Sequence, residues 1–368
     1  MLSNSFDTGH HVIQRASQAR KLAYTDRGHT GAAKTFVCLP GLLETRDNFA
    51  LLLALAESHV NSRWISIDHC GRGDSDPVTA SESYCMSLYM QDIEDFLHGY
   101  LFNKHPNAMG ELFLVGTSMG GILAMHLANK FPKKIAGIVL NDIGLTLYWW
   151  SLYGLYKGLD NFEAAQPQAH RKVIESIHPE AIQAVQSPSH FDLKYEFDWL
   201  GMHFHGLLKN FTGQVLLLHN DNSRLCPTDI AHQFKIHVPH LVFLSLEDDR
   251  HPAVWTPAAC QWLCAHVGLH RVLNQPALNP IQLPLFNAWP TVDQPSAALD
   301  LTGASNINPS PHITQAPHEL DERPFDGLTL KKFLTQSEQY FSSAFEDKAK
   351  TSKSLGKQTL MVIKSWFQ

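Results

Sequence analysis

The stretch LVGTSMGG, residues Leu114–Gly121, places a serine between closely spaced glycines directly after an apolar run. Leu112–Val115 has the composition of a short buried strand, and Ile122–Ala128 has that of the start of a helix. Between them, Gly116-Thr117-Ser118-Met119-Gly120 matches the pattern G-x-S-x-G. In that pattern the serine occupies a strained strand-to-helix turn, and the glycines avoid side-chain clashes. Ser118 is therefore a candidate nucleophile as well as a turn residue.

Length, charge and composition indicate an ordinary globular protein. The chain has 368 residues, of which 44% are hydrophobic and 17% are charged, which is enough to bury a sizeable core. The formal net charge of −6 gives no basic surplus, so we expect no nucleic-acid partner. No run of about 18 apolar residues occurs, so we expect no membrane span.

The N-terminal residues and the cysteines bear on the cellular compartment. The first residues lack the basic region and apolar stretch of a signal peptide. The six cysteines follow no metal-ligand spacing, and we expect them to be reduced thiols of the core. Together these features predict a cytoplasmic location.

Apolar runs alternate with turn signals between residues 12 and 268, and helical patterns fill several of the gaps. Strands that alternate with helices predict an α/β protein with a mostly parallel sheet of eight strands, covered by helices on both faces. The predicted strands are Val12–Ile13, Lys21–Tyr24, Lys34–Leu39, Trp64–Asp68, Leu112–Val115, Ile138–Asn141, Val215–Leu218 and Leu241–Leu244.

One gap between predicted strands is much longer than the others. Residues 143–212 separate the sixth strand from the seventh, are rich in aromatic side chains and have a helical pattern, which predicts a small helical cap over the sheet. The core is thereby divided into residues 1–142 and 213–270. Residues 271–368 form a linker rich in Pro, Asn and Ser followed by a helical tail, which we expect to dock on the core.

The loops at the carboxyl ends of parallel strands are where catalytic groups are expected. His251 follows the last predicted strand and precedes a helix that begins near Pro257. A serine nucleophile needs such a base to accept its proton and a third group to orient the base. Acyl transfer also needs two N–H donors, for which the amides of Leu42, after the third strand, and Met119 are the candidates.

The turn Asp68–Ser75 follows the fourth strand and contains two glycines among polar residues. Its composition is compatible with an active site. We expect a structural role, in which this turn shapes the loop beside Ser118 without touching substrate.

Five motifs occur in order along the chain: VCLPGLLETRDNF, DHCGRGDSD, LVGTSMGG, VLNDIG and RHPAVWTP. Together they resemble the α/β-hydrolase fold superfamily over residues 10–268, and within it a bacterial esterase-like branch with a D-I-G turn after the sixth strand. The resemblance implies that Ser118 is the nucleophile, that His251 is the base, and that the amides of Leu42 and Met119 form the oxyanion hole.

The acid of the triad is where this sequence departs from the family. Many members carry an aspartate a few residues after the seventh strand, where this chain has Ser223 and Arg224. The remaining candidates are Asp142, after the sixth strand, and Asp221, earlier in the seventh-strand turn. Either carboxylate would orient an imidazole, and we favour Asp142.

The predicted function is a serine hydrolase that cleaves an ester or related acyl bond of a small, apolar substrate. We expect no metal ion and no organic cofactor. The same groups also support amide or thioester hydrolysis, because the pocket rather than the fold sets the substrate. A different class of function, an inactive hydrolase fold used for binding, stays open as an alternative.

Overall fold

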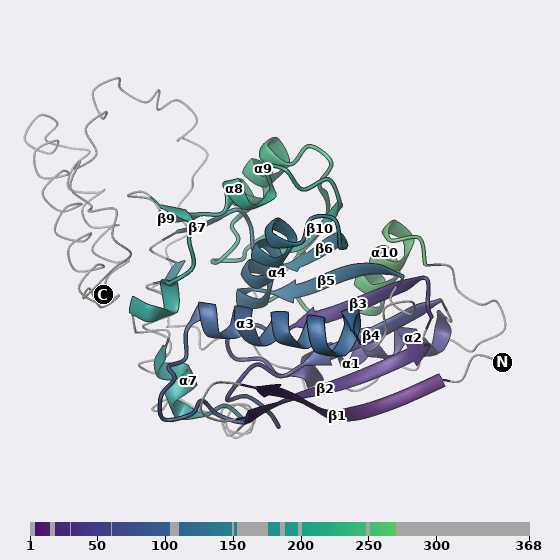
Figure 1. Ribbon diagram of the computed structural model, residues 1–368. Helices are drawn as coiled ribbons and strands as arrows, with labels where there is room; N and C mark the ends of the chain where they lie inside the picture. Colours follow the sequence, from purple (N-terminus) through teal and green to yellow (C-terminus); the bar gives the residue numbers. More distant parts are fainter. Residues whose placement is uncertain are drawn as a thin grey trace, which may run out of the picture.

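A computed structural model describes most of the predicted core and part of the long insertion (Figure 1). The described residues are 4–14, 19–29, 31–59, 61–103, 110–148, 151–152, 176–184, 188–197, 201–247 and 251–269. The predicted linker and helical tail, residues 271–368, lie outside them. None of the helices in these ranges combines the length and apolar character that a bilayer crossing needs. All six cysteines are free, and five of them are buried.

One eight-stranded sheet runs through the molecule in the order β1-β2-β4-β3-β5-β6-β10-β11. β2 pairs antiparallel with β1 and β4, and all neighbouring pairs from β4 to β11 are parallel. Each of the eight predicted strands overlaps one strand of this sheet, so the predicted fold class is confirmed. The strands are β1 (Asn4–Gln14), β2 (Ala19–His29), β3 (Lys34–Leu39), β4 (Ser62–Ile67), β5 (Glu111–Thr117), β6 (Ile135–Asn141), β10 (Gln214–Asn220) and β11 (Val242–Leu246).

Helices cover both faces of the sheet. The sheet lies between them and divides the apolar core into two clusters. Side chains alternate between faces along a strand. On β5, Leu112 and Leu114 therefore pack with α3 and α4, whereas Phe113 and Val115 pack with α1, α2 and α10. Figure 1 shows α3 crossing the near face of the sheet. The helices of the core are η1 (Arg46–Phe49), α1 (Ala50–Leu53), α2 (Leu55–Ser58), α3 (Met86–Phe96), η2 (Leu97–Phe102), α4 (Met119–Lys130), α9 (Thr228–His237) and α10 (Pro257–His266).

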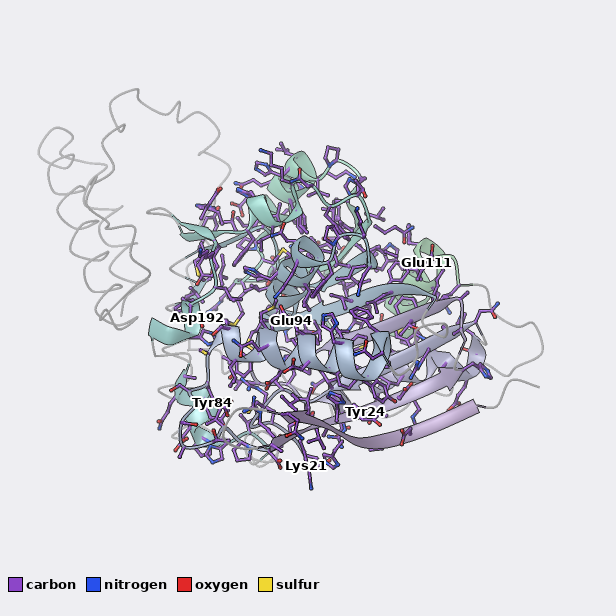
Figure 2. The ribbon with its side chains drawn as sticks, in the orientation of Figure 1. Lys21, Tyr24, Tyr84, Glu94, Glu111 and Asp192 are labelled. Carbon is purple, nitrogen blue, oxygen red and sulfur yellow. The ribbon has the colours of Figure 1, made fainter. Side chains whose placement is uncertain are left out.

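The hairpin of β1 and β2 is much longer than the two short runs predicted there, because its strands carry polar residues that interrupt the apolar pattern. Asp26 of β2 is buried and accepts two hydrogen bonds from Arg63 of β4, at 3.0 and 2.5 Å. The hydroxyl of Tyr100 donates to the same carboxylate at 2.7 Å. The ring of Tyr24 packs at a tilt against that of Tyr100, with 4.5 Å between centroids, and against Phe96 of α3 (Figure 2 labels Tyr24).

The insertion between β6 and β10, predicted as helical, also contains a small antiparallel sheet, and the prediction is corrected in this respect. Aromatic residues favour strands as well as packed helices, so the aromatic composition did not identify the element type. Gly201 allows the two longer strands to approach closely, because a Cβ there would lie 2.2 Å from the carbonyl oxygen of Leu147. The sheet has the order β7-β9-β8, with β7 (Thr146–Tyr148), β8 (Glu196–Phe197) and β9 (Gly201–His203), beside α7 (Pro179–Gln183), η4 (Pro188–Phe191) and α8 (His205–Leu208).

Candidate active site

Ser118 lies in the turn between the end of β5 and the start of α4. Its φ of 49° and ψ of −112° are unusual for a residue with a side chain, as expected for a strained strand-to-helix turn. The flanking glycines are needed for close backbone approach. A Cβ on Gly120 would lie 2.0 Å from the carbonyl oxygen of Leu39, and a Cβ on Gly116 would lie 2.4 Å from that of Gly120. Packing around the turn therefore requires the G-x-S-x-G pattern.

His251 follows β11 and is within hydrogen-bond distance of two of the predicted site residues. Its Nε2 lies 2.9 Å from Oγ of Ser118, and its Nδ1 lies 2.8 Å from Oδ2 of Asp142. The loop that carries it is attached to the end of β6, because the side-chain amide of Asn141 donates to the carbonyl of Ala253 at 2.8 Å. Ser118, His251 and Asp142 thus form one continuous chain of hydrogen bonds.

Asp142 is fully buried at the end of β6, with a left-handed φ of 55° that turns its carboxylate toward His251. Its Oδ1 accepts the amide of Asn220 at 3.2 Å. Its Oδ2 accepts the hydroxyl of Ser223 at 2.7 Å, in addition to contacting His251. Ser223, where the resemblance leads one to expect an acid, therefore helps to fix the carboxylate of Asp142.

Asp221, the other candidate acid, points to a different neighbour. Its carboxylate accepts a hydrogen bond from Ser245 of β11 and lies 3.7 Å from Nδ1 of His219, and its side chain is 42% exposed. Within the described residues its carboxylate makes no contact with His251. Asp248 and Asp249 lie outside the described residues.

The loop after β3, which carries Leu42, is fixed by the turn Asp68–Ser75. His69 donates from Nε2 to the carbonyl of Pro40 at 2.9 Å, and the buried Arg72 donates from Nε to the carbonyl of Leu42 at 2.9 Å. Burial lowers the pKa of His69 to about 3, with a smaller effect from the Arg72 charge, so the ring is neutral. This arrangement agrees with the structural role expected for the turn.

Leu42 and Met119 line the same pocket as Ser118. Met119 is the first residue of α4, where a helix leaves its amides without intrahelical acceptors. In the described part of the chain neither amide donates a hydrogen bond to a protein group. Both donors are therefore available to an oxygen beside Ser118.

Glu44 is a residue of this site that the sequence did not identify. Its Oε2 accepts the amide of Gly41 at 2.8 Å, which attaches the carboxyl to the Leu42 loop. Burial raises the pKa of Glu44 to about 7, although hydrogen bonds from Gly41 and Thr117 act in the opposite direction. Glu44 thus links the loop after β3 to the last residue of β5.

We expect Glu44→Gln to stabilise the protein increasingly as the pH rises. Because the pKa of about 7 in the folded state exceeds the ordinary 4.5, the contribution of Glu44 to stability is complete below pH 4.5 and is lost as the pH rises through 7. Glutamine stays neutral at every pH and keeps an acceptor for Gly41. The gain at pH 8.5 is on the order of 1–3 kcal/mol.

The measurement is the difference in Tm between Glu44→Gln and the unmodified protein across pH 5 to 8.5. The matched control is Asp47→Asn, which removes an exposed carboxylate three residues further along the chain, in η1. A difference in Tm for Glu44→Gln that is constant across this range would contradict the prediction.

A pocket that is partly open to solvent includes Ser118 in its wall. Its wall is mostly apolar and comes from both the core and the insertion. The core contributes Met86 and Ile122, and the insertion contributes Leu147 and Phe204. Apart from Ser118, the polar side chains among the described lining residues are His190 and Tyr195.

Asp142, His219 and Cys226 bring three metal-ligating atoms within 4.8 Å of one another in the described part of the chain. Both ring nitrogens of His219 and the carboxylate of Asp142 already have protein partners. Nε2 of His219 lies 2.8 Å from the carbonyl of Cys226, and its Nδ1 lies 2.8 Å from Oγ of Ser245. The ring of His219 is therefore already bound by protein groups on both sides.

A family model described as the alpha/beta hydrolase fold matches residues 34–155, from the start of β3 into the insertion. A solved α/β hydrolase from Novosphingobium aromaticivorans shares the fold with a TM-score of 0.55 and 18% identity, over 72% of this chain and 99% of that chain. The chain thus has the α/β-hydrolase fold. The esterase-like branch with a D-I-G turn stays a prediction.

Two curated proteins are each similar to about a third of the chain. A candidate 2-succinyl-6-hydroxy-2,4-cyclohexadiene-1-carboxylate synthase of Bacillus subtilis is 27% identical over 126 residues, 34% of this chain and 42% of the relative. A 3-hydroxybutyrate-oligomer hydrolase of Cupriavidus necator is 28% identical over 125 residues, 34% of this chain and 39% of the relative. The chain spans about two fifths of the length of these relatives.

Proposed function

We propose that the protein is a serine hydrolase that cleaves carboxylic esters through Ser118, His251 and Asp142. The observation that carries the proposal is the continuous chain of hydrogen bonds from Oγ of Ser118 through both ring nitrogens of His251 to a buried carboxylate. A serine hydroxyl is a weak nucleophile, and this arrangement is the one that activates it. The strained turn at Ser118 supports the same conclusion, because backbone strain of this kind is concentrated at active sites.

The reaction proceeds through an acyl-enzyme. Oγ of Ser118 attacks the ester carbonyl while Nε2 of His251 takes its proton, and the same nitrogen returns the proton to the leaving alcohol. The carboxylate of Asp142 holds the imidazole in the tautomer that presents Nε2 as an acceptor. The oxyanion is stabilised by the amides of Leu42 and Met119. Water, deprotonated by His251, then releases the acid and regenerates Ser118.

The pocket beside Ser118 supports an apolar acyl group as the substrate portion. Each methylene that enters an apolar site contributes about 0.8 kcal/mol, so kcat/KM rises about fourfold per carbon until the pocket is filled. Amide and thioester hydrolysis use the same chain of groups. The hydrolase relative from Cupriavidus necator bears a name that refers to oligomers of a hydroxy acid, which supports ester chemistry for this branch. The cytoplasmic location stays a prediction.

A fluorophosphonate probe tests the proposal and separates an enzyme from a binding protein. We expect covalent labelling at Ser118, identified by peptide mass spectrometry, and loss of the label in Ser118→Ala. We also expect kcat/KM for p-nitrophenyl esters to rise with chain length. Comparison of kcat/KM for matched esters, thioesters and amides then ranks the three reactions. A folded protein that is neither labelled nor active would support the binding alternative and reject the proposal.

A further inference from the structure

Two polar side chains interrupt the apolar wall of the pocket, and both come from the insertion. Nδ1 of His190 and the hydroxyl of Tyr195 are buried and have no hydrogen-bond partner among the residues that the structure describes. His190 as a whole is only 7% exposed. Burial of a polar atom without a partner is unfavourable, and buried polar groups in folded proteins are nearly always paired. Two residues that line one pocket therefore each carry a polar atom that a ligand would pair once the wall rearranges.

Each side chain packs against an aromatic ring, and a charged residue acts on each: Arg72 on His190 and Asp192 on Tyr195. The ring of His190 packs edge-on against Phe191 at 5.1 Å between centroids, and the ring of Tyr195 packs in the same way against Phe204 at 5.4 Å. Burial, assisted by the charge of Arg72, lowers the pKa of His190 to about 3, so its ring is neutral. Burial also raises the pKa of Tyr195, so its hydroxyl keeps its proton. The pocket therefore offers neutral hydrogen-bonding groups and no charge from these residues.

Both residues lie on one short segment that is tied to the core. Asp192, between them, accepts the amide of Ser87 at 3.0 Å, near the start of α3 (Figure 2). His190 and Tyr195 are therefore held beside the pocket by a fixed contact. Neither polar atom is open to water in the ligand-free structure, but Met86 and Met202 line the same pocket. Methionine side chains rearrange easily, which lets a substrate widen the pocket at this place.

We propose that His190 and Tyr195 select esters whose acyl group carries a hydroxyl group. The proposal rests on the proposed ester hydrolysis and adds the class of acid that the pocket takes.

The chemistry of the two atoms favours a hydroxyl group over other polar groups. Nδ1 of a neutral histidine is either a donor or an acceptor, depending on the tautomer, and a tyrosine hydroxyl is both. A substrate hydroxyl complements each of these combinations, because it donates one hydrogen bond and accepts others. A ketone only accepts, and a carboxylate would bring an unpaired charge into an apolar site. A plain alkyl chain would leave both protein atoms without partners, which lowers its transition-state affinity relative to the hydroxylated chain.

The test compares ethyl octanoate with ethyl octanoates that carry a hydroxyl group on carbon 3, 5 or 7, followed by acid release. We expect one hydroxy isomer to exceed ethyl octanoate in kcat/KM by about tenfold or more. Tyr195→Phe and His190→Leu reduce this ratio toward one. The matched control is Phe191→Leu, which alters the same wall without removing a polar atom. We expect it to change kcat/KM for ethyl octanoate and for the hydroxy isomers by the same factor. A ratio near one for every isomer, or a ratio that both polar variants leave intact, would overturn the proposal.

Two further measurements keep this test independent of the proposed reaction. Dissociation constants of the same esters, measured with Ser118→Ala, report the preference for a hydroxyl group without turnover. If the unmodified protein hydrolyses none of the esters, ester hydrolysis is refuted, and these dissociation constants still decide whether the pocket prefers a hydroxyl group. The Tm of ligand-free Tyr195→Phe is expected to rise, because the variant removes a buried hydroxyl that has no partner. A lower Tm would indicate that the hydroxyl has a structural partner and would count against a role in substrate binding.

Discussion

Ser118→Ala is expected to lower kcat for any ester that the protein hydrolyses by about 10⁴- to 10⁶-fold, with almost no change in stability. The substitution removes the single oxygen that lies 2.9 Å from Nε2 of His251, and no other group takes its place as the nucleophile. The residual rate comes from the oxyanion-hole amides and from substrate binding. The measurement is kcat on the best p-nitrophenyl ester, together with the Tm of both proteins.

Ser118→Gly provides a second variant that separates loss of chemistry from loss of fold. Alanine keeps a Cβ at a φ of 49° and therefore keeps the backbone strain, whereas glycine adopts this conformation without strain. Both variants are expected to be equally inactive, and Ser118→Gly is expected to have the higher Tm. Retention of more than about a tenth of the activity in either variant would contradict the assignment of Ser118.

The sequence predicted the sheet well because apolar runs and their punctuation carry the information directly. β3, β5 and β6 are buried on both faces and appear in the sequence as continuous apolar runs. The hairpin of β1 and β2 was underestimated for the opposite reason. Its buried Asp26 is neutralised by Arg63, a residue 37 positions later in the chain, and a local pattern does not reveal that pairing.

The candidate site was predicted in part. The strained serine turn and the histidine after the last strand are local signals, and the structure brings both residues together. The choice between Asp142 and Asp221 depends on the direction of each carboxylate, which is set by the left-handed φ of Asp142 and by the partner of Asp221 on β11. Glu44, His190 and Tyr195 are not identifiable from sequence, because their significance comes from burial and from the presence or lack of partners.

Asp142→Asn is expected to lower kcat by on the order of 10⁴, and Asp221→Asn is expected to change it little. Asparagine keeps the size of Asp142 and tolerates its φ of 55°, so the backbone is preserved. Its amide group favours the wrong imidazole tautomer and leaves the imidazolium without a buried negative charge. Asp221 lies on the far side of the turn, bonded to Ser245, so its replacement leaves His251 unaffected. Steady-state kinetics on one ester, with the Tm of each variant, measures both effects.

The reverse order of effects would move the acid to the turn after β10, and two mild variants would indicate a Ser118–His251 dyad or a carboxylate from Asp248 or Asp249.

A double variant makes the test sharper. Oγ of Ser223 lies 2.7 Å from the carboxylate of Asp142, so an aspartate at position 223 would place a carboxylate close to Nδ1 of His251. Ser223→Asp is therefore expected to restore part of the activity that Asp142→Asn loses, by about tenfold or more. Ser223 carries no charge. Ser223→Ala in the unmodified protein is therefore expected to remove only the hydrogen bond that Ser223 donates to Asp142. Rescue of this kind requires a negative charge beside the imidazole, whereas a purely structural role of Asp142 predicts that a second buried substitution makes the loss worse.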